Sequence, residues 1–180
     1  MSDMLNLLGI SGSLRAQSSN SLLVREAARL FGPSTFTFAD LRLPLYDGDL
    51  EQADGLPEAV TALTAQIRAA DAIVISTPEY NKALPGVLKN ALDWISRQPP
   101  MAFMGKPVAI MSSAAGRAGG ERAQFSLRLC LAAFGPRLLQ TPEVMVAGAA
   151  KAFDADGRLT DEKAVEILTA QMQALRAETG

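Results

Sequence analysis

Hydroxyl side chains and a single arginine are concentrated in the segment 11–20, whose sequence is SGSLRAQSSN. The apolar run Met4–Ile10 precedes this segment, and residues with helical spacing, Ser21–Phe31, follow it. Free backbone N–H groups at a helix start, together with serine hydroxyls, can bind a phosphate group, and Arg15 could add a charge-assisted hydrogen bond. An ordinary capped turn with a solvated Arg15 explains the segment equally well. Neither the P-loop pattern nor Gly-x-Gly-x-x-Gly is present, which disfavours a nucleoside triphosphate.

Two further loops have residues that could contact a ligand. Thr77–Gly86 contains two prolines that stiffen it, so its backbone amides could bind the edge of a flat heteroaromatic ring. A rigid connector in which Tyr80 packs and Asn81 makes a turn is the alternative, and residue chemistry alone slightly favours it. Ser112–Gly120 consists mostly of small residues, which would let a ligand approach the backbone closely, although a flexible connector has the same composition.

Short apolar runs alternate with segments of helical spacing along the chain, which is typical of a parallel α/β sheet. We expect strands at Met4–Ile10, Ser34–Ala39, Ala72–Ser76, Pro107–Met111 and Leu138–Val146, the last broken at Pro142. We expect helices at Ser21–Phe31, Pro57–Ala70, Pro85–Arg97, Glu121–Phe134 and Asp161–Arg176, with Thr160 capping the last. The pattern predicts one domain over residues 1–180, a flavodoxin-like three-layer α/β/α sandwich with a five-stranded parallel sheet of order 2-1-3-4-5. Ligands of such folds bind beyond the carboxyl ends of the strands, where all three loops are expected to meet.

The composition excludes several kinds of chemistry. The 180 residues are 48% hydrophobic with a formal net charge of -2, which disfavours nucleic acid and anionic membrane surfaces as partners. The chain has no histidine, the commonest general base and transition-metal ligand, so we expect a bound cofactor and no metal site. The single cysteine, Cys130, lies in an apolar stretch, which favours a buried structural thiol over a reactive one. No secretory signal or membrane-spanning run is evident, so we expect a cytoplasmic protein.

Three motifs together resemble the NADPH-dependent FMN reductase family, which includes quinone, chromate and azo-dye reductases. The first is GSLRxxSxN from Gly12, the second is PEYNxxxPGxLKNAxDW from Pro78, and the third is GGxxAQxxLR from Gly119. The second motif is the most specific, because so many positions match in one unbroken segment.

This resemblance implies a role for particular residues. The FMN phosphate would be held by Ser13, Arg15, Ser18, Ser19 and Asn20. The isoalloxazine would be held, mostly through backbone groups, by Pro78, Glu79, Tyr80 and Asn81, and its other side would be lined by Ser112, Ser113 and Gly116. Lys89, Asn90, Asp93 and Trp94 would organise a helix and the subunit interface of a homodimer or a tetramer built from dimers.

The resemblance predicts an NAD(P)H:acceptor oxidoreductase with ping-pong turnover. FMN would take hydride from NADPH or NADH and pass electrons to a quinone, chromate, an azo compound or free flavin. No side-chain acid or base is required when the cofactor performs the redox chemistry, so we expect no catalytic residue in the strict sense. A flavodoxin-type electron carrier is an alternative, although such carriers tend to be strongly acidic. A flavin-binding redox sensor, or a supplier of reduced flavin to another enzyme, also remains open.

Overall fold

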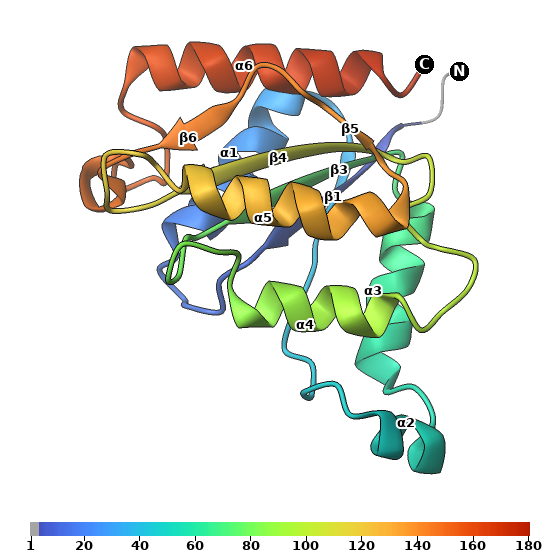
Figure 1. Cartoon of the computed structure of the whole chain (residues 1–180). Helices are drawn as coiled ribbons and strands as arrows, with labels where there is room; N and C mark the ends of the chain where they lie inside the picture. Colours follow the sequence, from blue (N-terminus) through green and yellow to red (C-terminus); the bar gives the residue numbers. More distant parts are fainter. Residues whose placement is uncertain (1–3) are drawn as a thin grey trace.

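Runs of buried aliphatic residues form the centre of a parallel six-stranded sheet. The computed structural model describes residues 4–180. The strands are β1 (Asn6–Ser11), β2 (Thr35–Phe38), β3 (Ala72–Thr77), β4 (Pro107–Ser113), β5 (Arg137–Leu138) and β6 (Val144–Val146). Their order is β2-β1-β3-β4-β5, with β6 also paired to β4, and this confirms the expected flavodoxin-like arrangement (Figure 1). The carboxyl ends of β1, β3 and β4 therefore lie side by side.

Helices cover both faces of this sheet and complete three layers, whereas α2 lies away from the sheet, next to the start of α3 (Figure 1). They are α1 (Ser19–Phe31), α2 (Gly48–Asp54), α3 (Glu58–Ala69), α4 (Gly86–Ile95), α5 (Glu121–Leu131) and α6 (Glu162–Ala177), with short 3-10 helices η1 (Ala132–Phe134) and η2 (Ala149–Lys151). Successive β3 side chains point to opposite faces. Ile73 and Ile75 pack in a buried cluster with α3, α4 and α5, whereas Val74 packs in the cluster formed with α1 and α6. This burial on both faces explains why β3 reads as a continuous apolar run.

Three details differ from the sequence-based expectations or refine them. The expected fifth strand is divided into β5 and β6, and the interruption includes Pro142, as predicted. The predicted cap Thr160 is wrong, because the Asp161 carboxylate accepts the hydrogen bond from the Ala164 N–H at 2.7 Å and caps α6. Helix α2 was not predicted, since none of its seven residues is buried and it therefore has no amphipathic pattern.

A buried carboxylate connects α1 to the turn that precedes α6. Only 1% of the Glu26 side chain is exposed, and it accepts hydrogen bonds from Arg29 Nε at 2.9 Å and Arg29 Nη2 at 2.8 Å. Arg158 Nη1 donates a third hydrogen bond to it at 3.1 Å. The hydrogen bonds from Arg29, the largest influence, lower the pKa of Glu26 below its ordinary value, with Arg158 adding to this effect and burial opposing it.

A Glu26→Gln variant is expected to lose about 1–3 kcal/mol of unfolding free energy at pH 7, because charge-assisted hydrogen bonds are replaced by weaker neutral ones. The folded-state pKa of Glu26 is depressed, so its contribution is present above the unfolded-state pKa and is lost as pH falls through the folded-state pKa. Urea unfolding between pH 7 and pH 3 should therefore show the two proteins converging in stability at low pH. A difference in unfolding free energy that stays constant over that pH range would contradict the ionised state assigned to Glu26.

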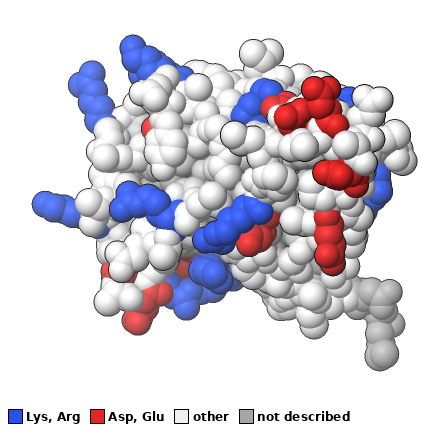
Figure 2. Space-filling model, turned by 90° about the horizontal axis from the view of Figure 1, so that it is seen from below, with Lys and Arg blue, Asp and Glu red and all other residues white. Residues whose placement is uncertain are grey.

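Charged side chains are distributed unevenly over the surface. In the view of Figure 2, most of the lysines and arginines lie on the left, whereas most acidic side chains lie on the right. The left is also the side on which the loops after β1, β3 and β4 lie in Figure 1. An anionic ligand would be attracted to this side of the molecule. Across residues 4–180, no helix combines the length and apolar character needed to cross a membrane.

Candidate functional site

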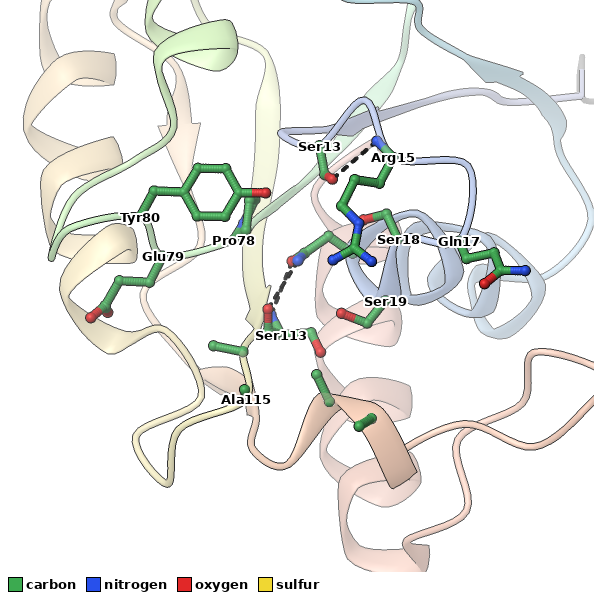
Figure 3. A pocket seen from close by; sticks show the side chains of 14 residues that line it. Ser13, Arg15, Gln17, Ser18, Ser19, Pro78, Glu79, Tyr80, Ser113 and Ala115 are labelled. Atoms are coloured by element: carbon green, nitrogen blue, oxygen red, sulfur yellow. Dashed lines mark hydrogen bonds between the residues drawn. The ribbon is translucent and has the colours of Figure 1, made fainter.

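The loops that follow β1, β3 and β4 meet at a pocket of about 410 Å³, within the usual size range of small-molecule sites (Figure 3). The structure brings together most of the residues predicted from the sequence. Those that line the pocket are Ser13, Arg15, Ser18, Ser19, Asn20, Pro78, Glu79, Tyr80 and Ser113. The pocket is also lined by five residues without a predicted role: Gln17, Ala114, Ala115, Ala149 and Ala150. The first three lie within the predicted loops, and the last two lie outside them. Ala149 and Ala150 follow β6, so a search of the loop after the last strand would have found them.

Three predicted site residues do not line this pocket. Asn81 is exposed at φ 52° in a turn closed by two hydrogen bonds of 3.1 Å between the backbones of Tyr80 and Ala83. Ser112 is fully buried, donates to the Gly119 carbonyl at 2.7 Å and accepts from Gln124 Nε2 at 2.8 Å. Gly116 lies in the exposed part of the loop after β4. All three are therefore placed to shape the loops that surround the pocket.

The first loop ends at a capped helix start. Ser18 is the N-cap of α1: its hydroxyl accepts from the Ser21 N–H at 3.4 Å, and its carbonyl accepts from the Leu22 N–H at 3.0 Å. Among the residues that the structure describes, nothing accepts a hydrogen bond from the N–H of Ser19 or Asn20. These two donors, together with the positive end of the helix dipole, are suited to bind an anion.

Arg15 supplies the positive charge of the pocket. Figure 3 shows its side chain extending back over the start of α1, toward Ser18 and Ser19. Within residues 4–180, no carboxylate forms an ion pair with its guanidinium. The charge is therefore available to a ligand, and the planar guanidinium can donate two parallel hydrogen bonds to a phosphate.

Asn20 joins the helix start to the two central strands. Its side chain is buried, and its Oδ1 accepts from the Ser76 hydroxyl at 2.8 Å and from the Ser113 N–H at 3.0 Å. Its Nδ2 donates to the Ser113 carbonyl at 2.9 Å. The side chain thus links α1 to β3 and β4. Because its amide oxygen already accepts two hydrogen bonds, the backbone N–H of Asn20 is the group left for a ligand.

The first and second loops lie in close contact. The Gly12 N–H donates to the Ser76 carbonyl at 2.8 Å. A Cβ atom at Gly12 would lie 3.1 Å from both Pro78 Cδ and Pro85 Cγ, so a side chain there would push the two loops apart. The absence of a side chain at Gly12 therefore allows the first loop to lie close against the second.

The second loop contributes backbone groups and one aromatic ring. Glu79 Oε2 accepts from the Arg122 N–H at 3.1 Å, and Figure 3 shows the Glu79 side chain directed away from the pocket centre. This carboxylate is occupied at the start of α5, where the helix dipole favours a negative charge. Tyr80 is 50% exposed and its ring is free to contact a flat ligand.

Ser113 carries a polar atom without a partner. Its hydroxyl is buried and makes no hydrogen bond to any group of the described chain, although the residue lines the pocket. A buried hydroxyl without a partner costs free energy, and a polar ligand group that reached it would recover this cost. Together with Arg15 and the free N–H groups of α1, this hydroxyl fits a ligand that has both a phosphate and further polar groups.

Comparison with known proteins gives consistent results over almost the whole chain. The sequence pattern of the NADPH-dependent FMN reductase family matches residues 5–151. An NAD(P)H-dependent FMN reductase of Pseudomonas aeruginosa is 50% identical over 178 residues, which cover 98% of this chain and 96% of the relative. A quinone reductase of Escherichia coli K12 is 39% identical over 97% of this chain and 95% of its own length. The solved structure of a flavoenzyme NAD(P)H:(acceptor) oxidoreductase from Paracoccus denitrificans has a TM-score of 0.88 and 34% identity, covering 98% of this chain and 97% of that one.

Proposed function

Because the chain belongs to the NADPH-dependent FMN reductase family, we propose that residues 1–180 act as one FMN-binding domain that passes electrons from NAD(P)H to a small acceptor. The chain is an oxidoreductase of the NAD(P)H-dependent FMN and quinone reductase type, with FMN as its cofactor and NADPH or NADH as electron donor. The pocket at the carboxyl ends of β1, β3 and β4 is the place where this chemistry is proposed to occur.

The observation that carries this proposal is the set of hydrogen-bond donors in one pocket that have no acceptor in the described chain. The phosphate of FMN would be bound by the Arg15 guanidinium, the N–H groups of Ser19 and Asn20, and the hydroxyls of Ser13, Ser18 and Ser19. The Ser113 hydroxyl, which has no partner in the described chain, would bind a further polar group of the cofactor. A capped turn that binds no ligand would not explain why these hydrogen-bond donors converge on one pocket.

The isoalloxazine is proposed to lie against the second loop. Pro78, the Glu79 backbone and the Tyr80 ring would contact one side, while Ser113 and its neighbours after β4 would line the other. Asn81, Ser112 and Gly116 are proposed to support the ring by holding these loops in shape, since none of the three lines the pocket. When bound, FMN supplies the hydride-accepting and electron-donating chemistry. The residues of the chain bind and orient it and exclude water from one side.

The proposed turnover is ping-pong, with the oxidised nucleotide leaving before a small acceptor enters the same site. A quinone is the acceptor class that the relatives' names favour, and chromate, azo compounds and free flavin are further proposed acceptors. Initial rates with NADPH and 1,4-benzoquinone should give parallel lines in double-reciprocal plots. Intersecting lines would contradict ping-pong turnover, and reduction that requires a partner protein would favour an electron carrier instead.

A homodimer, or a tetramer built from dimers, is the proposed assembly. The side chains of Phe125 and Leu129 on α5 are 55% and 78% exposed. Met104, in the segment that precedes β4, is 61% exposed. Exposed large apolar side chains of this kind are typical of surfaces that a second subunit covers.

A Ser113→Ala variant is expected to bind FMN about tenfold more weakly, because a hydrogen bond of roughly 1 kcal/mol or slightly more is lost. Its unfolding free energy without FMN should not fall, since the hydroxyl makes no hydrogen bond within the described chain. The matched control Ser112→Ala removes a hydroxyl with two partners and should instead destabilise the fold by about 1–3 kcal/mol. Fluorescence titration with FMN and urea unfolding measure the two effects, and equal stability losses in both variants would contradict the assignment.

A further inference from the structure

A second pocket lies on the other side of the first loop, toward the end of β2. Its volume is about 330 Å³, and three arginines line it: Arg15, Arg25 and Arg42. Asp40 is the one carboxylate among its lining residues. The formal charge of the lining is therefore +2, from three guanidinium groups and one carboxylate. It remains +1 when the Arg15 guanidinium is counted with the FMN phosphate instead.

Two of these arginines are held in place by neighbouring groups. The Arg25 guanidinium lies 4.7 Å from the centroid of the Phe38 ring, and none of the carboxylates in residues 4–180 forms an ion pair with it. Arg42 Nη1 donates to Asp40 Oδ1 at 3.1 Å, and Arg42 Nη2 lies 3.5 Å from the Leu14 carbonyl of the first loop. Arg25 thus keeps a full unpaired charge, and Arg42 is tied to the loop that forms the first pocket.

The second pocket is continuous with the proposed flavin site. The two pockets share Ser13 and Arg15 in their walls. A third hollow of about 380 Å³ shares Leu14 with the second pocket and Tyr80 with the first, and it is largely apolar. A ligand whose one end rests on the flavin beside Tyr80 could therefore follow this groove past Leu14 and reach the arginines with its other end.

We propose that the Arg25 and Arg42 pocket binds the phosphate monoester on the adenosine ribose of NADPH and thereby selects NADPH over NADH. This inference rests on the proposed function, because it assigns the donor of that reaction. The planar guanidinium group can donate paired, charge-assisted hydrogen bonds to a phosphate monoester, whereas the uncharged ribose hydroxyl of NADH offers no charge for it to bind. Here the Asp40 carboxylate already accepts from the Arg42 N–H at 3.0 Å and from its guanidinium, which favours the phosphate.

Direct binding of nucleotide fragments tests the assignment without turnover. Calorimetric titration of the FMN-loaded protein should show 2′,5′-ADP binding at least tenfold more tightly than 5′-AMP. Arg25→Gln and Arg42→Gln should each remove most of this difference, whereas Asp40→Asn should increase it, since a repelling charge is lost. Arg137→Gln changes an arginine beside the amino end of β4, at the opposite edge of the sheet, and should leave the difference unchanged. Melting temperatures close to that of the original protein would show that the variants are folded.

Steady-state rates give the second measurement. In Arg25→Gln and Arg42→Gln, kcat/KM for NADPH should fall at least tenfold while that for NADH changes less than twofold. Equal affinities of the protein for 2′,5′-ADP and 5′-AMP would overturn the inference while leaving the proposed function intact. Equal losses of kcat/KM for NADPH and NADH in the two arginine variants would do the same. Failure of both donors to reduce bound flavin would instead overturn the proposed function, and the fragment titration would still report on the arginine pocket.

Discussion

An Arg15→Ala variant is expected to bind FMN about 10- to 150-fold more weakly than the original chain. The guanidinium lines the pocket and forms no ion pair with any carboxylate of the described residues, so its charge is available to the phosphate. Loss of hydrogen bonds to a charged group costs about 1.5–3 kcal/mol, which corresponds to this range. Stability without FMN should change little, because Arg15 is exposed and its side chain makes no hydrogen bond within residues 4–180.

Equilibrium dialysis or fluorescence titration with FMN measures this effect. Arg137→Ala is the matched control, since it removes an exposed arginine at the far edge of the sheet and should leave FMN affinity unaltered. Riboflavin, which lacks the phosphate, should bind the original chain and Arg15→Ala with similar affinity. If Arg15→Ala weakens riboflavin and FMN equally, the residue acts on the ring or on the fold, and the phosphate assignment is wrong.

An Asn20→Leu variant is expected to lose about 3 kcal/mol or more of unfolding free energy. The change keeps a similar volume but removes three hydrogen bonds, and it leaves the Ser113 N–H and carbonyl and the Ser76 hydroxyl buried without partners. FMN affinity should fall as well, because the same bonds hold the start of α1 against the ends of β3 and β4.

Urea unfolding of Asn20→Leu without FMN separates the structural effect from ligand binding. Ser19→Ala is a suitable control, since the neighbouring Ser19 hydroxyl lines the pocket and makes no hydrogen bond to the described chain. It should retain full stability and weaken FMN binding modestly. Unchanged stability in Asn20→Leu would mean that these hydrogen bonds do not hold the helix start in place.

The strands and the three loops could be predicted because both depend on local patterns. β3 is buried on both faces, so it reads as an apolar run, and the carboxyl ends of parallel strands must meet at one edge. The role of Asn20 could not be predicted in the same way, since its partner Ser113 is 93 residues away and the sequence does not show which polar groups meet. The position of Arg25 could not be predicted either, because only the fold brings this α1 residue beside Phe38 at the end of β2.

The sequence also could not separate residues that line the pocket from those that support it. Ser112 and Ser113 are adjacent and chemically identical, yet alternation along β4 directs one hydroxyl to Gly119 and Gln124 and leaves the other without a partner. Helix α2 lacks a buried face, so no periodic signal marks it.

A visible spectrum of the FMN-loaded protein, recorded before and after anaerobic addition of NADPH, tests the central claim most directly. The account predicts that the absorbance band of protein-associated flavin bleaches, and that a quinone added afterwards restores it. A bound flavin that stays oxidised with both NADPH and NADH would contradict the proposed enzyme. A protein that retains no FMN would contradict the assignment of the pocket itself.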